Sequence, residues 1–186
     1  MIILFLYFIS TKNLLYLLTK YPCNNLSLNL TLYQYYQNMK KVNKKTNAAI
    51  IVIGNEILSG RTQDVNVVHL SKWLNELGVK VEEVRVIPDL EDSIVATIKE
   101  VRKKFKYVFT TGGIGPTHDD ITSKSIAAAF NLSYGYHNEA YEILEKYYNP
   151  GEFNEGRKKM AMLPKKASLI LNPSSAAPGF IVENVY

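Results

Sequence analysis

The sequence predicts an α/β protein with a parallel sheet, and three observations lead to this expectation. Apolar runs rich in β-branched residues alternate with segments of helical periodicity, the third run ends in a glycine-rich loop, and that loop opens another helical segment. Strand, helix, strand, helix, strand is the order in which parallel sheets are built. Ligands of such sheets bind beyond the carboxyl ends of the strands. The loops at those ends are therefore the first places to look for a site.

Three strands are expected at 48–54, 79–88 and 107–111. The first, "AAIIVIG", is a continuous apolar run, as is typical of a strand buried on both faces. Its successors, "VKVEEVRVIP" and "YVFTT", have the same β-branched and aromatic character. The loop "GNEILSG" follows the first strand and the loop "GGIGPTHDD" follows the third. Both loops are expected at one edge of the sheet.

Two helices are expected to connect these strands. The segment 66–77 places Val67, Leu70 and Leu74 on one face, with Asp64 or Asn66 as its cap and Gly78 at its end. The segment 89–105 is expected to be helical too, with Asp89 as its cap and basic residues in its last turn.

The rest of the chain supplies shorter elements. After the helical segment "SKSIAAAF", further helices are expected at 138–149 and 155–163, and Pro164 ends the second of them. Strands are expected at 167–173 and 179–186.

Residues 1–38 differ in composition from the rest. They contain no Ala, Gly, Val, Asp, Glu, Arg, His or Trp. They lack the basic start and cleavage site of a signal peptide, and their first apolar run is too short to span a membrane. We interpret them as an over-extended gene start before Met39, with a membrane-associating segment as the alternative. The domain is therefore expected at 39–186, with no membrane segment.

Composition narrows the class of protein. The net charge of +5 is modest, and the lysine pairs are spread along the chain, so no nucleic-acid partner is expected. The single cysteine, Cys23, excludes an internal disulfide, which is usual in a reducing compartment. A cytoplasmic protein is expected.

The loop "TTGGIGPTHDDIT" carries the chemistry. Gly112, Gly113 and Gly115 allow positive φ and close approach of a ligand to the backbone, and the helix start that follows offers an anion site. The loop is neither a Walker loop nor a dinucleotide fingerprint. A tight turn without a ligand remains the alternative.

Asp119 and Asp120 strengthen the ligand interpretation. Adjacent aspartates cannot both cap one helix, so one is expected to cap and the other to point elsewhere. A carboxylate beside bound phosphate requires a cation, and Mg²⁺ or another divalent cation is the usual solution, with Asp120 and Asp119 as the candidate metal ligands. Thr117 and Thr122 add hydroxyls that can reach phosphate or cap the helix. Glu56 and Asp89 follow the first and second strands, with capping as the alternative for Asp89.

At this point the residues resemble a known family. "GNEILSGRTQDVN", "TTGGIGPTHDDIT", "MAMLP" and "NPSSAAPGF", in this order, are similar to the molybdopterin-binding (MoaB/Mog-like) domain family, and within it to the CinA branch, over about 48–185. The resemblance implies a three-layer α/β sandwich with a mostly parallel sheet, and a homo-oligomer. It implies a small-molecule nucleotide or pterin phosphate as ligand.

The resemblance also implies site residues. The family's functional aspartates correspond to Asp120 in the "D-x-T" element and to Asp89 after the second strand. The remaining correspondences are with substrate- and phosphate-binding positions. They are Gly112, Gly113, Gly115, Pro116 and Thr117 in the glycine loop, Glu56 and Ser59 in the "GNE-x-x-SG" loop, Asn66 at the first helix, and Pro173, Ser174 and Ser175 in the "NP" loop.

Three functions follow from the resemblance as hypotheses. The first is divalent-metal-dependent hydrolysis of a nucleotide pyrophosphate such as ADP-ribose, with Asp120 and Asp89 holding the metal or positioning water. The second is molybdopterin binding without hydrolysis. The third is an inactive gene remnant, because the family continues into another strand where this chain stops at "FIVENVY". The chain is expected to be truncated at its C-terminus, so activity is less firmly expected than fold.

Overall fold

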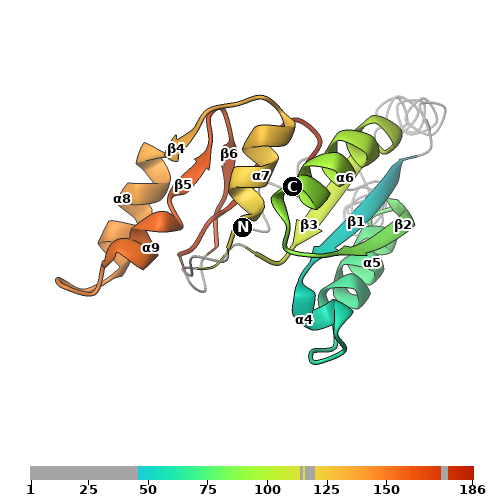
Figure 1. Cartoon of the computed structure of the whole chain (residues 1–186), viewed down its shortest axis with the longest axis horizontal. Helices are drawn as coiled ribbons and strands as arrows, with labels where there is room; N and C mark the ends of the chain where they lie inside the picture. Colours follow the sequence, from blue (N-terminus) through green and yellow to red (C-terminus); the bar gives the residue numbers. More distant parts are fainter. Residues whose placement is uncertain (1–45, 114, 116–119, 173–175) are drawn as a thin grey trace, which may run out of the picture. The chain divides into compact units, whose positions relative to one another are not determined.

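A computed structural model describes residues 46–113, 115, 120–172 and 176–186. Its centre is a three-stranded parallel sheet in the order β2 (Lys80–Ile87), β1 (Asn47–Ile53), β3 (Tyr107–Thr111) (Figure 1). Two crossover helices connect the strands: α5 (Asn66–Glu76) lies between β1 and β2, and α6 (Glu91–Lys104) between β2 and β3. These three strands and two helices were predicted from the sequence, and the α/β fold class is confirmed.

The side chains of β1 alternate between two hydrophobic cores. Ile51 and Ile53 face a large core that includes residues of α6 and α7 (Thr122–Ala129), whereas Ile50 and Val52 face a smaller core that includes Leu74 of α5. All of β1 except Asn47 is buried, which explains its unbroken apolar sequence. Helices therefore cover both faces of the sheet, as in a three-layer sandwich.

The second half of the described chain adds two short antiparallel pairs. β4 (Tyr134–Tyr136) pairs with β5 (Met162–Pro164), and β6 (Ser168–Ile170) pairs with β7 (Gly179–Ile181). Three further helices complete the described elements. They are α4 (Asn55–Leu58), α8 (Asn138–Tyr147) and α9 (Glu155–Lys159).

Two predictions for this half were wrong in extent. The helix expected at 155–163 ends after Lys159, because Ala161 and Leu163 are buried in alternation and "MLP" pairs with β4. The strand expected at 179–186 stops at Ile181, and the chain turns at Glu183, which has a φ of 52°. β4, β5 and α4 were not predicted.

After that turn the chain returns to the parallel sheet. The Val108 N–H donates to the Asn184 carbonyl at 2.9 Å, and the Tyr186 N–H donates to the Val108 carbonyl at 2.8 Å. The Thr110 hydroxyl also donates to the Tyr186 carbonyl at 2.8 Å. Residues 184–186 thus run alongside β3 on the edge opposite to β1. Within the described residues, no helix is long and apolar enough to cross a membrane.

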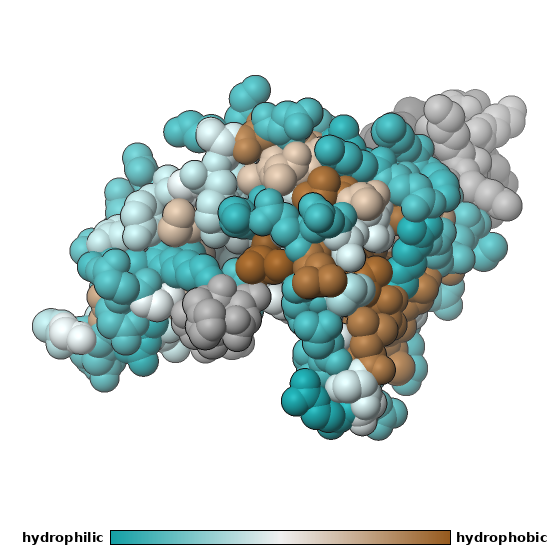
Figure 2. Space-filling view, in the orientation of Figure 1, coloured by the Kyte–Doolittle hydropathy of each residue, from teal (hydrophilic) through white to brown (hydrophobic). Residues whose placement is uncertain are grey.

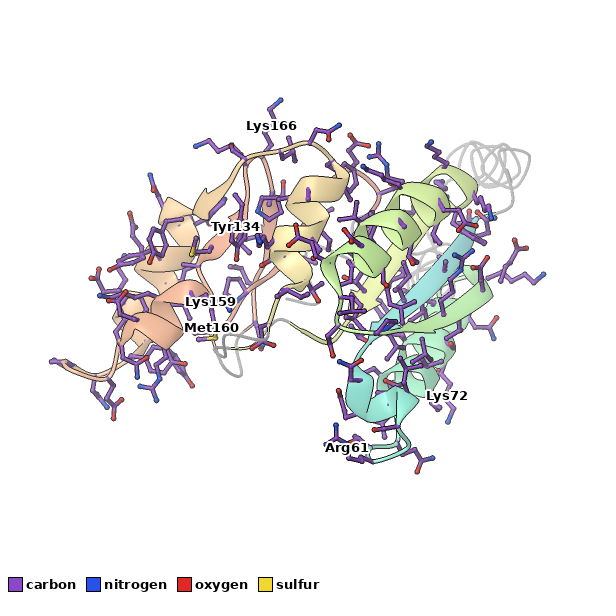
Figure 3. The ribbon with its side chains drawn as sticks, viewed as in Figure 1. Arg61, Lys72, Tyr134, Lys159, Met160 and Lys166 are labelled. Atoms are coloured by element: carbon purple, nitrogen blue, oxygen red, sulfur yellow. The ribbon has the colours of Figure 1, made fainter. Side chains whose placement is uncertain are left out.

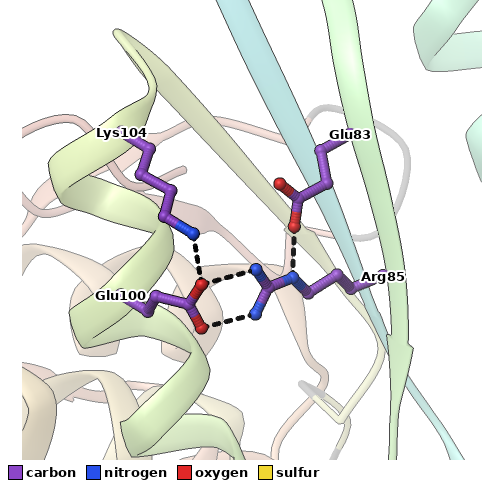
Figure 4. Close-up of polar contacts among 4 residues, drawn as sticks. All are labelled: Glu83, Arg85, Glu100 and Lys104. Carbon is purple, nitrogen blue, oxygen red and sulfur yellow. Dashed lines mark hydrogen bonds and ion pairs between the residues drawn. The ribbon is translucent and has the colours of Figure 1, made fainter.

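A four-residue ion network joins β2 to α6 on one face of the sheet (Figure 4). Arg85 donates through both terminal nitrogens to Glu100 at 2.8 Å and through Nε to Glu83, and Lys104 also donates to Glu100. The hydrogen bonds from Arg85, and then those from Lys104, lower the pKa of Glu100 from its ordinary value of 4.5 to about 2. The network links the edge strand to its crossover helix.

Glu100 is expected to give the folded state a pH-dependent stability. Because its pKa is lowered on folding, its contribution is fully present above pH 4.5 and is lost as the pH falls to about 2. Chemical denaturation of the wild type and of Glu100→Gln should therefore give a stability difference that shrinks across this window. Glu139→Gln, at an exposed position of α8, is the matched control and should leave the pH dependence unchanged. A difference that is constant with pH would contradict the prediction.

Candidate functional site

The ends of the three parallel strands meet at one edge of the sheet. β1 is followed by Gly54, whose N–H donates to the Ile87 carbonyl at the end of β2 at 3.1 Å. β3 is followed by Gly112, which packs so closely on the Ile53 carbonyl that a Cβ there would overlap the oxygen. The three loops that begin here are therefore in direct contact. This is where parallel sheets bind their ligands.

Asp89 joins two of these loops. Its Oδ2 accepts a hydrogen bond of 2.9 Å from the Asn55 N–H, and its Oδ1 lies 3.6 Å from the place that a Cβ on Gly113 would occupy. The prediction that Asp89 caps the following helix was wrong: α6 begins at Glu91 after Leu90, and no side chain caps it. The carboxylate instead lies between the loop after β1 and the glycine loop.

The glycine loop has the backbone that its sequence predicted. Gly112 and Gly113 have φ angles of 94° and 62°, which side chains rarely allow. Thr122 closes the loop, since its N–H donates to the Gly113 carbonyl at 3.1 Å and its hydroxyl to the Gly112 carbonyl at 2.9 Å. Thr122 is fully buried, so the structure places it in the support of the loop and not on the ligand side.

Asp120 lies at the other end of the loop, over Gly115. Its Oδ2 is 2.8 Å from the place that a Cβ on Gly115 would occupy, so only glycine leaves room for the carboxylate there. α7 begins after Ile121, whose side chain makes no capping hydrogen bond. Of the two aspartates considered from the sequence, Asp119 lies outside the described residues.

A pocket opens beside Asp120 and Gly115. Its walls come from α7, β4, β5, β7 and the end of α9, and Figure 3 labels Tyr134, Lys159 and Met160 among them. The Ser123 and Tyr134 hydroxyls in this pocket are 3.2 Å apart and share a hydrogen bond. The complete lining is Gly115, Asp120, Ser123, Tyr134, Lys159, Met160, Met162, Leu163, Pro178 and Phe180.

Sequence reasoning missed Ser123, Tyr134 and Lys159. Only Lys159 had a usable signal, because it directly precedes the "MAML" of a motif already singled out. Tyr134 comes from a strand of three residues, too short for a periodic pattern. The pocket combines one acidic and one basic side chain with hydroxyls and apolar methionine and phenylalanine walls.

The loop after β1 holds two more predicted residues. Glu56 folds back so that its Oε1 is 2.7 Å from the place that a Cβ on Gly54 would occupy, beside the strand end. The Ser59 hydroxyl donates to the Glu56 carbonyl at 3.2 Å and accepts from Arg61 at 3.1 Å. Asn66 is the exposed first residue of α5, and the Asp64 carboxylate accepts the Val67 N–H at 2.8 Å, as expected of a residue at a helix start. Ser59 and Asn66 do not line the pocket.

Several predicted site residues lie outside the described part of the chain. They are Pro116, Thr117 and Asp119 in the glycine loop and Pro173, Ser174 and Ser175 in the "NP" loop.

The described residues could hold a cation only if a bound ligand supplied further atoms that coordinate it. Among them, no three His, Cys, Asp or Glu side chains form a cluster that can hold a metal ion alone. The described glycine-loop residues are flanked by two separate carboxylates, Asp89 near Gly113 and Asp120 over Gly115. Mg²⁺ commonly uses one or two protein carboxylates and takes its other ligands from substrate phosphate and water. This donor set is compatible with that mode of binding.

The chain is thus an α/β domain whose candidate site is a glycine loop with neighbouring carboxylates. This site lies at the carboxyl ends of the parallel strands. The sequence profile of the family described as "Probable molybdopterin binding domain" matches residues 49–185. The chain therefore belongs to the molybdopterin-binding (MoaB/Mog-like) domain family, as its motifs predicted.

Known proteins agree with this assignment. The crystal structure of the protein CinA, of unknown function, from Thermoplasma acidophilum is 32% identical, with a TM-score of 0.69 over 73% of this chain and 80% of that chain. A protein of Archaeoglobus fulgidus is 39% identical over 73% of this chain and 58% of its own length, and one of Aeropyrum pernix is 40% identical over 73% and 52%. The chain thus spans a little over half the length of these curated relatives.

Proposed function

We propose that this domain hydrolyses a nucleotide pyrophosphate such as ADP-ribose with the help of a divalent cation. The observation that carries the proposal is the position of two carboxylates near the glycine loop, Asp89 on Gly113 and Asp120 on Gly115. Asp89 accepts a hydrogen bond from the Asn55 N–H and does not cap α6. Carboxylates beside backbone that can approach phosphate suit metal-assisted phosphoryl chemistry. As in the sequence-based expectation, the reaction is proposed to occur in the cytoplasm.

The loop would bind the pyrophosphate through its backbone. Gly112 and Gly113 have no side chains to block the approach of phosphate oxygens, and α7 starts directly after the loop. Thr122 holds this backbone in place through two hydrogen bonds, so the loop is shaped before a ligand arrives. The loop is therefore proposed to position the phosphates, and the aspartates to act on them.

The pocket beside Asp120 would bind the organic part of the ligand. Met160, Met162 and Phe180 provide apolar walls, and Tyr134 provides an aromatic ring with a hydroxyl. Lys159 lies in the same pocket and supplies the positive charge that a phosphate ester requires nearby. The pocket and the glycine loop share Gly115 and Asp120, so one ligand can occupy both.

The proposed reaction is a hydrolysis at phosphorus. Water forms a bond to one phosphorus, the bridging P–O–P bond breaks, and the second phosphate leaves with the electron pair, so that ADP-ribose yields AMP and ribose 5-phosphate. A bound cation would offset the charge that develops on the phosphate oxygens. Asp120 and Asp89 are proposed to hold that cation or to orient the attacking water, whose proton passes to a carboxylate and then to solvent.

Molybdopterin binding without hydrolysis is the second candidate function. It is favoured by the family match over residues 49–185 and by a pocket whose mixed lining also suits a pterin ring. Pterin phosphates and nucleotides share a flat heterocycle joined to phosphate. The two candidates therefore differ in whether a bond is broken.

One experiment distinguishes the two candidate functions. The full chain is incubated with ADP-ribose, FAD or NADH, with and without Mg²⁺, Mn²⁺ or Co²⁺. Product formation that requires a divalent cation supports the first function. Saturable molybdopterin binding with no hydrolysis under any of these conditions supports the second. If the folded chain neither hydrolyses these compounds nor binds molybdopterin, both proposals fail.

Lys159→Ala is expected to weaken substrate binding more than the chemical step. Removing a charge-assisted contact to phosphate typically costs about 1.5–3 kcal/mol, or roughly 10- to 150-fold in KM. Lys166→Ala, an exposed lysine in the turn before β6, is the matched control and should leave KM unchanged. Steady-state kinetics at saturating cation give both constants. Equal loss of kcat and kcat/KM, with KM unchanged, would place Lys159 in the chemistry instead.

A further inference from the structure

A second hollow lies in the part of the chain that contains α8 and α9. It has a volume of about 400 Å³ and is formed by α8, by the turn after that helix and by Lys158 of α9. It shares no lining residue with the pocket beside Asp120. This volume is sufficient for a small ligand. The surface that Figure 2 shows over α8 and α9 is mainly hydrophilic, so a charged ligand suits this region better than an apolar one.

Three aromatic rings form the wall of this hollow. Tyr141 and Tyr148 are seven residues apart, which puts them on one side of α8 and its end. The turn after the helix brings Phe153 back against both rings. Its ring centroid is 5.0 Å from that of Tyr141, at an interplanar angle of 71°, and 6.2 Å from that of Tyr148, at 12°. All three side chains are partly exposed, so the rings remain accessible to a ligand.

One of these rings already has a cation against it. The Arg157 guanidinium lies over the Tyr148 ring, 4.2 Å from its centroid. The Asn154 side chain accepts the Arg157 N–H at 3.0 Å and thereby caps the start of α9. The face of an aromatic ring carries partial negative charge and attracts cations. Arg157 does not line the hollow, so this contact leaves the hollow itself open.

The charged side chains around the hollow leave one carboxylate unmatched. Lys158 donates to Glu155 at 2.6 Å, and the Arg157 guanidinium lies 4.0 Å from the Glu152 carboxylate. Glu145 lines the hollow and has no hydrogen-bond or ion-pair partner among the residues that the structure describes. The hollow therefore combines aromatic rings with an uncompensated negative charge.

We propose that this hollow binds a small organic cation that carries a quaternary ammonium group. Such a group has no N–H to donate, so aromatic faces and the attraction of a nearby carboxylate suffice to hold it. Tyr141, Tyr148 and Phe153 supply the rings, and Glu145 supplies the charge. A primary ammonium group is more strongly hydrated, and aromatic faces cannot replace the hydrogen bonds to water that it would lose.

Choline and its neutral analogue 3,3-dimethylbutan-1-ol test the proposal, because they have the same shape and differ in charge. NMR titration of the full chain should show saturable binding of choline with a Kd of about 1 mM or tighter, and binding of the alcohol at least about tenfold weaker. This readout does not depend on hydrolysis at the candidate site. No approach to saturation by choline at about 10 mM, or equal affinity for the two compounds, would overturn the proposal.

Two variants test the residues of the hollow. Phe153→Leu keeps an apolar side chain but removes a ring, and should weaken choline binding at least about fivefold. Glu145→Gln removes the charge at an exposed position and should weaken choline binding at least about threefold. Glu139→Gln, the matched control, changes another exposed carboxylate of α8 that does not line the hollow, and should bind choline like the wild type.

Circular dichroism establishes that each variant remains folded. If Phe153→Leu does not fold, Glu145→Gln still decides, because its side chain is exposed. Choline binding that is unchanged in either folded variant of the hollow contradicts the proposal. So does a loss in Glu139→Gln as large as the loss in Glu145→Gln, since the effect would then come from the general surface charge of α8.

Discussion

Replacing Asp120 by asparagine is expected to lower the kcat of metal-dependent ADP-ribose hydrolysis by at least about 10²-fold. Asparagine has nearly the same shape, so the variant keeps the packing over Gly115 and removes only the negative charge. Without that charge the site holds a divalent cation less well, and the apparent affinity for the cation should fall together with kcat. Initial rates measured across a Mg²⁺ titration give both quantities.

Two further variants test whether the loss of activity is specific to the Asp120 carboxylate. Asp92→Asn changes an exposed aspartate in the first turn of α6 and should leave kcat unchanged. Asp89→Asn keeps a carbonyl oxygen that can accept the Asn55 N–H, so any loss of activity there reflects charge and not the loop connection. Hydrolysis that is unchanged in Asp120→Asn would contradict the role given to this residue. Unchanged hydrolysis in both site variants would remove the carboxylates from the mechanism.

Gly112→Ala is expected to destabilise the domain by about 2–4 kcal/mol, the largest stability change expected of any substitution described above. The residue has a φ of 94°, and a methyl group there would overlap the backbone carbonyl oxygen of Ile53, which cannot rotate away. The strain would be relieved only by moving the loop or the end of the central strand. Denaturant unfolding followed by circular dichroism measures the loss.

A second glycine separates steric overlap from backbone strain. Gly151 has a similar φ of 88°, but a Cβ there meets no atom within 4 Å. Gly151→Ala should therefore cost only about 1 kcal/mol, the cost of the backbone conformation alone. Equal losses at the two positions would show that the contact with Ile53 contributes little. Gly112→Ala should in addition reduce ligand binding, because the same glycine shapes the loop.

The central sheet could be predicted because its signals are local. β1 and β3 are short apolar segments with clear ends, and α5 and α6 repeat their apolar residues at helical spacing. β4 and β5 could not be predicted, because each has only three residues and they pair across 26 to 30 positions, from Tyr136 with Met162 to Tyr134 with Pro164. The pairing, and not the local sequence, makes these segments strands.

The candidate site, too, could be predicted only where its signals are local. The glycines and aspartates were visible as a motif, but the partners of their side chains were not. Asp89 looked like a helix cap, and its carboxylate instead bonds to an amide 34 residues earlier. Thr122 was expected to reach phosphate or to cap the helix, and its hydroxyl is buried and donates to the Gly112 carbonyl. Lys159 and Tyr134 reach the pocket from elements distant in sequence, so only the folded chain brings them to Asp120.

The contact between β3 and residues 184–186 has a consequence for the order of folding. Thr110 and Tyr186 are 76 residues apart, so this contact closes a far longer loop than the crossovers that join β1, β2 and β3. Long loops carry the greater entropic cost of closure and form contacts late. The outer side of β3, which leads into Gly112 and Gly113, should therefore be the last part of the central sheet to become protected from hydrogen exchange during refolding. The candidate site would then reach its folded structure after the sheet that supports it.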